Sequence, residues 1–185
     1  TNKYENMRKV IAAINMTLDG FCDHTARIVA DEELHLHYAD LLNNAGVLLY
    51  GRKTYQLMQF WQTLLINPSD EKSMNDFAIS IDKIEKLVFS NTLKDTGWST
   101  AKLASRPLEE EILELRRQPG KGIFVGSRSL IIQLLDEFQI CIHPVIEGRG
   151  LPLFDKIKDR KFFKCSKTKT LGSGAIVLYY EPKRQ

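Results

Sequence analysis

Two segments of the chain share one pattern: a short apolar run, a glycine, and then a polar stretch that can begin a helix. They are residues 47–55 (VLLYGRKTY) and residues 123–130 (IFVGSRSL). A continuous apolar run before the glycine is typical of a parallel strand that is buried on both faces. The glycine permits a tight turn, and the free N–H groups at a helix start attract phosphate. The pair therefore indicates an α/β fold with a phosphorylated ligand, such as a dinucleotide, at a sheet edge.

The rest of the chain continues this alternation of strands and helices. We expect strands at residues 9–16, 47–50, 86–90, 122–125 and 138–146, and helices at residues 31–44, 51–60, 75–81, 108–118 and 126–135. Asp31 is the expected N-cap of the first helix. Two final strands, residues 161–170 and 175–181, predict a hairpin.

The predicted fold class is therefore α/β, with a mostly parallel central sheet, flanking helices and a C-terminal antiparallel hairpin. No repeat or linker divides the chain, so a single domain is expected over residues 1–185. The net charge of +3, from 26 basic and 23 acidic residues, is too small and too dispersed to indicate nucleic-acid binding.

The apolar run at residues 10–16 is too short for a signal peptide or a membrane span, so no membrane partner is expected. The three cysteines, Cys22, Cys141 and Cys165, are far apart and show no metal-ligand spacing. This usage is typical of reduced thiols in a cytoplasmic protein without a metal site.

The histidines point to the same conclusion about metals. His35 and His37 lie two residues apart on a predicted helix, so they point to different faces and are expected at the surface or in a cleft. His143 precedes Pro144 in a predicted strand and is expected to be structural.

Four motifs resemble, in order, those of the reductase domain at the C-terminal end of the bacterial bifunctional deaminase–reductase of riboflavin biosynthesis. Residues 15–20 (NMTLDG) resemble its SLDG turn, and residues 50–55 (YGRKTY) its GRxTY motif. Residues 125–130 (VGSRSL) resemble its GG…L junction. Residues 136–137 (DE) with 143–154 (HPVIEGRGLPLF) resemble its DE…PvllGxGxPLF ending. The resemblance implies the dihydrofolate reductase fold.

The resemblance also implies NADPH as the cofactor. Its expected binding residues are Gly51, Arg52, Thr54, Ser90, Gly126, Ser127, Ser129 and Leu130. In this assignment Gly51, Arg52 and Thr54 hold phosphates, and Ser90 lies near the adenosine end. The second junction cradles the pyrophosphate. A guanidinium and hydroxyls at helix starts suit a charged phosphate diester.

Asn15 and Asp19 are expected to face the nicotinamide and the substrate, with Asp19 as the candidate catalytic residue. A bare Asp-Gly turn explains Asp19 equally well. No zinc-binding deaminase pattern is present, so the chain resembles the stand-alone members. The resemblance further implies a homodimer that acts on a small-molecule substrate.

The chain departs from the family pattern at two places. Ser127 replaces the second glycine, and serine still offers its N–H group. Only Asp136 and Glu137 separate Leu135 from Phe138. Since αβ loops usually take about 2–6 residues and the family has a longer helix end here, a few residues are expected to be absent, either deleted or skipped in the numbering.

Three functions remain open. The first is an NADPH-dependent reductase that resembles 5-amino-6-(5-phosphoribosylamino)uracil reductase and acts on a small heterocyclic or ribose-linked substrate. The second is dihydrofolate reductase, ranked lower because helix capping accounts for Asp31 and Glu33, which lie roughly where those enzymes keep a substrate carboxylate. The third is a catalytically inactive dimeric nucleotide-binding module, with residues 175–180 as an apolar edge that could pair with or pack against a second subunit.

Overall fold

The computed structural model describes residues 7–22, 28, 30–130, 135–155 and 157–183. Its strands are β1 (Val10–Thr17), β2 (Ala45–Gly51), β3 (Glu85–Phe89), β4 (Ala101–Leu103), β5 (Gly122–Val125), β6 (Glu137–His143), β7 (Phe163–Thr170) and β8 (Ile176–Pro182). Its helices are α1 (Glu32–Asn43), α2 (Arg52–Met58), α3 (Phe60–Ile66), α4 (Lys72–Lys83) and α5 (Leu108–Arg117), with a 3₁₀ turn η1 (Arg128–Leu130).

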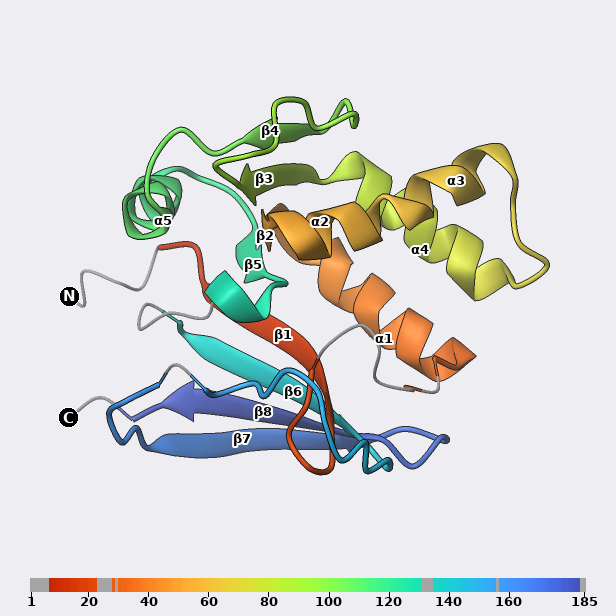
Figure 1. The fold of residues 1–185 in the computed structure, drawn as a ribbon, viewed down its shortest axis with the longest axis vertical. Helices are drawn as coiled ribbons and strands as arrows, with labels where there is room; N and C mark the ends of the chain where they lie inside the picture. Colours follow the sequence, from red (N-terminus) through yellow and green to blue (C-terminus); the bar gives the residue numbers. More distant parts are fainter. Residues whose placement is uncertain (1–6, 23–27, 29, 131–134, 156, 184–185) are drawn as a thin grey trace.

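These strands form one sheet in the order β4-β3-β2-β5-β1-β6-β8-β7 (Figure 1). The first six strands in this order, β4-β3-β2-β5-β1-β6, are parallel to one another. Strand β8 runs antiparallel to β6, and β7 runs antiparallel to β8. The expected fold class, a mostly parallel sheet with a C-terminal antiparallel hairpin, is confirmed. Among the described helices, none is long and apolar enough to cross a membrane.

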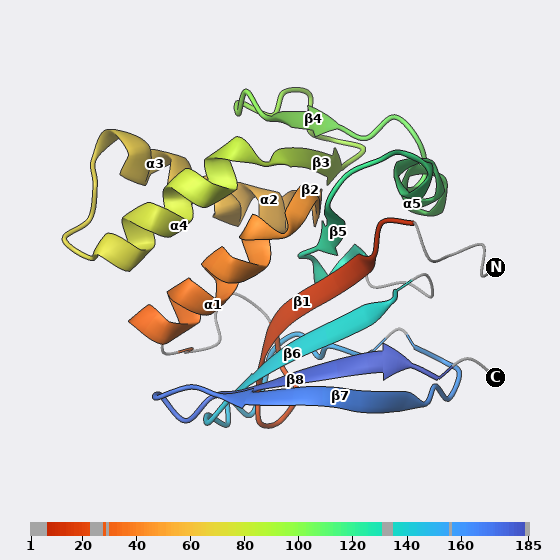
Figure 2. The same ribbon diagram turned by 180° about the vertical axis from the view of Figure 1, so that it is seen from behind.

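Helices cover both faces of the sheet, because successive residues of each buried strand point to opposite sides. Leu49 packs with Ile112 of α5 on one face. Leu48 packs with Leu42 of α1 and Ile81 of α4 on the other face. Figure 2, which views the molecule from the opposite side to Figure 1, shows α1 and α4 on the near face of the sheet. The two apolar layers explain why the central strands are apolar along their whole length.

The helix ends follow the sequence signals where these are strong. Asp31 caps α1, since its Oδ1 atom accepts a hydrogen bond of 2.9 Å from the Leu34 N–H group. Helix α5 spans Leu108–Arg117, with acidic residues in its first turn and Arg116 and Arg117 in its last. Both features were predicted.

The region after α2 differs from the prediction. An irregular chain was expected from Trp61, but the helix α3 spans Phe60–Ile66 and buries none of its side chains fully. A helix that is only partly buried carries no clear apolar stripe, so its periodicity is weak. The short edge strand β4 was not predicted, and β6 ends at His143 rather than at residue 146.

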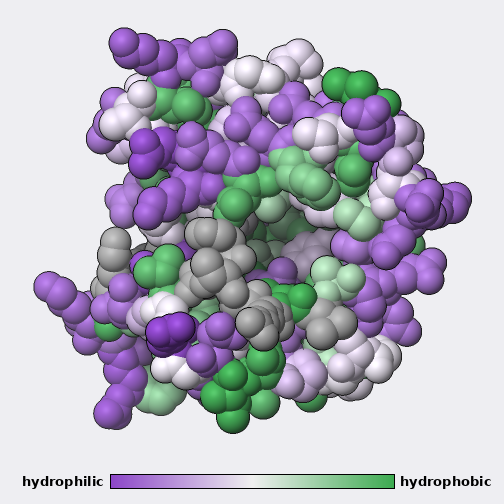
Figure 3. Space-filling view, turned by 45° about the vertical axis from the view of Figure 1, so that its right-hand side comes forward, coloured by the Kyte–Doolittle hydropathy of each residue, from purple (hydrophilic) through white to green (hydrophobic). Residues whose placement is uncertain are grey.

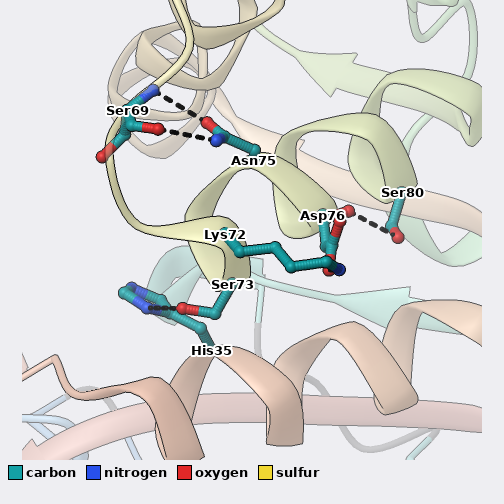
Figure 4. A network of polar contacts seen from close by, with 7 residues as sticks. All are labelled: His35, Ser69, Lys72, Ser73, Asn75, Asp76 and Ser80. Carbon is teal, nitrogen blue, oxygen red and sulfur yellow. Dashed lines mark hydrogen bonds and ion pairs between the residues drawn. The ribbon is translucent and has the colours of Figure 1, made fainter.

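Helix α4 begins at Lys72, three residues earlier than expected, because side chains hold its start (Figure 4). Ser69 and Asn75 exchange two hydrogen bonds, from the Ser69 N–H group to Asn75 Oδ1 (2.9 Å) and from Asn75 Nδ2 to the Ser69 carbonyl (2.8 Å). The Ser73 hydroxyl lies 3.4 Å from Nδ1 of His35 on α1. His35 and His37 are buried, which rules out the surface alternative of the prediction, and they contact different neighbours.

The expected free edge at residues 175–180 is not found in the C-terminal hairpin. Strand β8 pairs with β6 on one side and with β7 on the other, so residues 175–180 offer no free edge for pairing with a second subunit. The outer strand is β7, whose exposed side chains include Lys164, Lys167 and Lys169. Lysines on an edge strand oppose edge-to-edge pairing.

The short link before β6 is tied directly to the sheet. That a few residues are absent before Asp136 stays a prediction. The Asp136 N–H group donates to the Val10 carbonyl, and its Oδ2 atom accepts from the Val10 N–H group and from Arg116. The helix expected after Gly126 begins as the 3₁₀ turn η1, and residues 131–134 lie outside the described residues.

Candidate functional site

The two glycine junctions lie side by side at the carboxyl ends of the neighbouring parallel strands β2 and β5. The Gly51 N–H group donates a hydrogen bond of 2.9 Å to the Ser127 hydroxyl. The Gly126 N–H group donates to the Leu49 carbonyl at 3.1 Å. The structure therefore brings the predicted residues of both junctions together. Carboxyl ends of parallel strands are where open α/β sheets bind their ligands.

Gly126 is required by packing. A Cβ atom added there would lie 2.5 Å from Cε1 of Tyr50, whose side chain is buried. At Gly51 the corresponding atom would lie 2.9 Å from the Ser129 hydroxyl, which belongs to an exposed residue. The two glycines thus avoid different neighbours, a buried ring at one and a surface hydroxyl at the other.

Two predicted cofactor residues of the second junction have internal roles. Ser127 is 1% exposed, and its hydroxyl is the acceptor for Gly51. Leu130 packs into the core on the α5 face and donates its N–H group to the Ser127 carbonyl at 3.0 Å. Contact of these residues with a cofactor stays a prediction.

A cation and two hydroxyls gather beside the first junction. Exposed Arg52 donates from Nη1 to the Thr92 hydroxyl at 3.0 Å. The Ser90 hydroxyl accepts from the N–H groups of Thr92 (3.2 Å) and Leu93 (3.0 Å), which holds the turn after β3. Thr54 is half-buried in the first turn of α2. Thr92 was missed in the sequence, where its position two residues after Ser90 was the available signal.

Asp19 ties two loops together. Its Oδ1 atom accepts from the Thr17 hydroxyl at 2.7 Å and from the Glu147 N–H group at 3.2 Å, and its Oδ2 atom accepts from the Gly148 N–H group at 2.7 Å. The Thr17 hydrogen bond, aided by these backbone bonds, lowers the pKa of the Asp19 carboxyl below its usual range. Asp19 is therefore ionised at neutral pH and is held as an acceptor. Its place at a reacting centre stays a prediction.

Asn15 contacts His143, which was expected to have a structural role. Nε2 of His143, at the end of β6, lies 2.9 Å from Oδ1 of Asn15 on β1. His143 is 1% exposed, and burial lowers the pKa of its imidazole. The register places Thr17 opposite His143, so the pair lies where both parallel strands end.

These groups lie along one edge of the sheet, at the carboxyl ends of β3, β2, β5, β1 and β6 in that spatial order. Figure 3 shows the molecule hollowed near the centre of one face, with apolar residues in part of the wall. Among the described residues, no group of three or more His, Cys, Asp or Glu side chains could hold a metal ion. The groups present suit an anion at Arg52 and a hydrogen-bonding acceptor or donor at Asn15.

Comparison with known families gives one match over most of the chain. The family described as the RibD C-terminal domain matches residues 8–177. The uncharacterized protein YyaP of Bacillus subtilis (strain 168) is 31% identical over 183 residues, which cover 94% of each chain.

Solved structures show the same fold at lower identity. A putative riboflavin biosynthesis protein from Shewanella sp. PV-4 has a TM-score of 0.70 at 19% identity, covering 95% of this chain and 99% of that one. A diaminohydroxyphosphoribosylaminopyrimidine deaminase/5-amino-6-(5-phosphoribosylamino)uracil reductase from Thermotoga maritima has a TM-score of 0.64 at 15% identity. That alignment covers 96% of this chain and 57% of the Thermotoga chain.

Proposed function

This chain belongs to the RibD C-terminal domain family, and on that premise we propose that it is an NADPH-dependent reductase of a small heterocyclic or ribose-linked substrate. The family supports a reductase-like protein of the riboflavin pathway. The solved Thermotoga protein is named as a reductase of 5-amino-6-(5-phosphoribosylamino)uracil. That compound is the substrate we propose first.

The observation that carries the cofactor proposal is the group formed by Arg52, Ser90 and Thr92. The guanidinium comes from the first residue of α2, and the hydroxyls come from the turn after β3. Arginine pairs with phosphate through two parallel N–H donors, and hydroxyls add further donors. NADPH differs from NADH by an additional phosphate on the adenosine ribose, which suits such a group.

When bound, NADPH would supply a hydride from C4 of its nicotinamide. The residues of this chain would bind and orient the two reactants, which is the usual contribution of a protein to cofactor chemistry. Arg52 with the Ser90 turn would hold the phosphate end, and Asn15 would contact the nicotinamide or the substrate. The ionised Asp19 carboxylate would act as a hydrogen-bond acceptor, and a water molecule would be the proton carrier in this proposal.

The structure favours the aminouracil substrate over dihydrofolate. Asp31 accepts from Leu34 as a helix cap, and Glu33 accepts from the Gly172 N–H group in the hairpin turn. Both candidate carboxylates on α1 therefore already have backbone partners. These structural roles support ranking dihydrofolate below the aminouracil substrate.

The test follows NADPH absorbance with purified protein and 5-amino-6-(5-phosphoribosylamino)uracil, with dihydrofolate and NADH in parallel. We expect oxidation of NADPH with the aminouracil and little with dihydrofolate. NADPH binding without turnover on either substrate would favour the inactive nucleotide-binding module. Absence of NADPH binding by calorimetry would contradict the proposal.

A further inference from the structure

Asn15 and His143 share one face of the sheet. Strands β1 and β6 are parallel neighbours, with Asn15 opposite Cys141 and Thr17 opposite His143. Side chains alternate along a strand, so Asn15, Cys141 and His143 point to the same side. Cys141 packs against Leu34 of α1, which identifies this side as the face that α1 covers.

The hydrogen bond between the two side chains has one favoured direction. Burial lowers the pKa of His143 below its ordinary value of 6.5, although the charge of Asp31 acts to raise it. The imidazole is therefore neutral at pH 7 and carries a single N–H group. Oδ1 of Asn15, 2.9 Å from Nε2, can only accept. In this arrangement Nε2 carries the proton and Nδ1 carries a lone pair.

The reverse arrangement is less favourable. If the Asn15 amide were flipped, its NH₂ group would donate to Nε2, and the single proton of the ring would move to Nδ1. Nδ1 is buried and has no hydrogen-bond partner among the described residues. A buried N–H donor without an acceptor is rarer and costlier than a buried lone pair. The buried ring therefore selects the orientation of the Asn15 amide.

This orientation leaves the Asn15 amide nitrogen as the free end of the pair. Asn15 is half-buried, whereas His143 is buried. Within the described part of the chain, the hydrogen bond to His143 is the one that Asn15 makes through its side chain. Two N–H donors are thus presented at the end of β1, where an open α/β sheet binds its ligand.

We propose that His143 is a positioning residue that orients the Asn15 amide nitrogen toward the ligand, so that Asn15 binds a carbonyl oxygen or an imine nitrogen. The acceptor belongs either to a ring carbonyl of the substrate or to the carboxamide of the nicotinamide. A ligand with an amino group at this position would be rejected, because two donors would then face each other. The inference rests on the proposed function, since that function places the ligand at Asn15.

The tautomer can be tested without any ligand. The chain contains four histidines, and comparison with His143→Gln assigns the His143 signals in a ¹⁵N NMR spectrum of the whole protein. We expect a neutral ring protonated at Nε2. A ring protonated at Nδ1, or at both nitrogens at pH 7, would overturn the proposal.

The source of the acceptor is distinguished by adding the two ligands in turn. The side-chain NH₂ signals of Asn15 should shift with NADPH alone if the carboxamide is the acceptor. They should shift only after 5-amino-6-(5-phosphoribosylamino)uracil is added if the substrate is the acceptor. If other signals move and those of Asn15 do not, the proposal is wrong and the proposed function stands. If no signal moves with either ligand, the proposed function fails while the tautomer result is unaffected.

Variants separate positioning from general structure. His143→Leu removes the donor to Asn15 and should weaken binding of the responding ligand about tenfold, whereas His143→Gln retains an N–H donor and should stay within about threefold. Asn15→Asp replaces the two donors with acceptors and should weaken binding more than Asn15→Ala does. Thermal unfolding of each variant reports folding. Equal affinities in folded His143→Leu and His143→Gln would contradict a positioning role.

Discussion

The two glycine junctions share a sequence pattern but differ in what surrounds them. After Gly51 the chain forms the regular helix α2, and the exposed guanidinium of Arg52 lies beside the turn after β3. After Gly126 the described chain enters the 3₁₀ turn η1, and Ser127 is buried. The cation of the second junction, Arg128, donates to the Pro152 carbonyl at 2.7 Å and pairs with Asp155.

This difference predicts separate roles for two similar motifs. The first junction leaves its charge at the surface next to hydroxyls, as an anion-binding group requires. The second junction uses its serine and its cation to hold neighbouring segments of the protein. A shared strand–glycine pattern therefore predicts a shared position at the sheet edge, and it does not predict a shared function.

The largest expected effect is on stability at the second junction. Gly126→Ala places a Cβ atom 2.5 Å from the buried Tyr50 ring. We expect a loss of about 3 kcal/mol, or roughly 6–12 °C in melting temperature, because the ring must move within a packed core. Differential scanning calorimetry measures it.

The matched variant is Gly51→Ala, whose Cβ atom meets a hydroxyl on an exposed residue that can rotate away. Its loss of stability should be less than half as large. Equal losses at the two glycines would show that the packing difference between the junctions has no energetic consequence.

The next largest effect is expected from removing the hydrogen bond between Ser127 and Gly51, which joins the two junctions. Ser127→Ala leaves the Gly51 N–H group without its acceptor, and we expect a loss of about 2 kcal/mol in the free energy of unfolding. Chemical denaturation with urea measures it. Ser129→Ala, at an exposed position of the same turn, should change stability by less than about 0.5 kcal/mol. A small loss at Ser127 would mean that water replaces the hydroxyl.

The smallest effects are expected at the two arginines, where one variant should change cofactor affinity and the other should change stability. Arg52→Ala should weaken NADPH binding about tenfold, or about 1.4 kcal/mol, with little change in melting temperature, because its side chain is exposed. Arg128→Ala should do the opposite, with a loss of about 1 kcal/mol of stability and nearly unchanged affinity. Calorimetric titration with NADPH tests both. If Arg128→Ala lost affinity and Arg52→Ala did not, the roles of the junctions would be reversed.

Much of the fold could be predicted because its signals are local. The apolar runs of β2 and β5, the Asp31 cap and the charge order of α5 each depend on a few adjacent residues. Helix α3 and strand β4 were missed because they are partly exposed or very short, so their patterns are weak. The candidate site was predicted in part, since Arg52 and Ser90 are neighbours in space and Thr92 was not identified.

The sequence by itself determined the α/β class, the order of the strands along the chain and the positions of the two glycine turns, because periodicity and backbone freedom are properties of short segments. Only the tertiary structure decided that β8 is an inner strand, that the Ser127 hydroxyl accepts from the Gly51 N–H group and that the His143 ring contacts Asn15. The residues of the two side-chain contacts are 76 and 128 positions apart in the chain. Contacts at such separations depend on sheet order and register, and no local pattern records either.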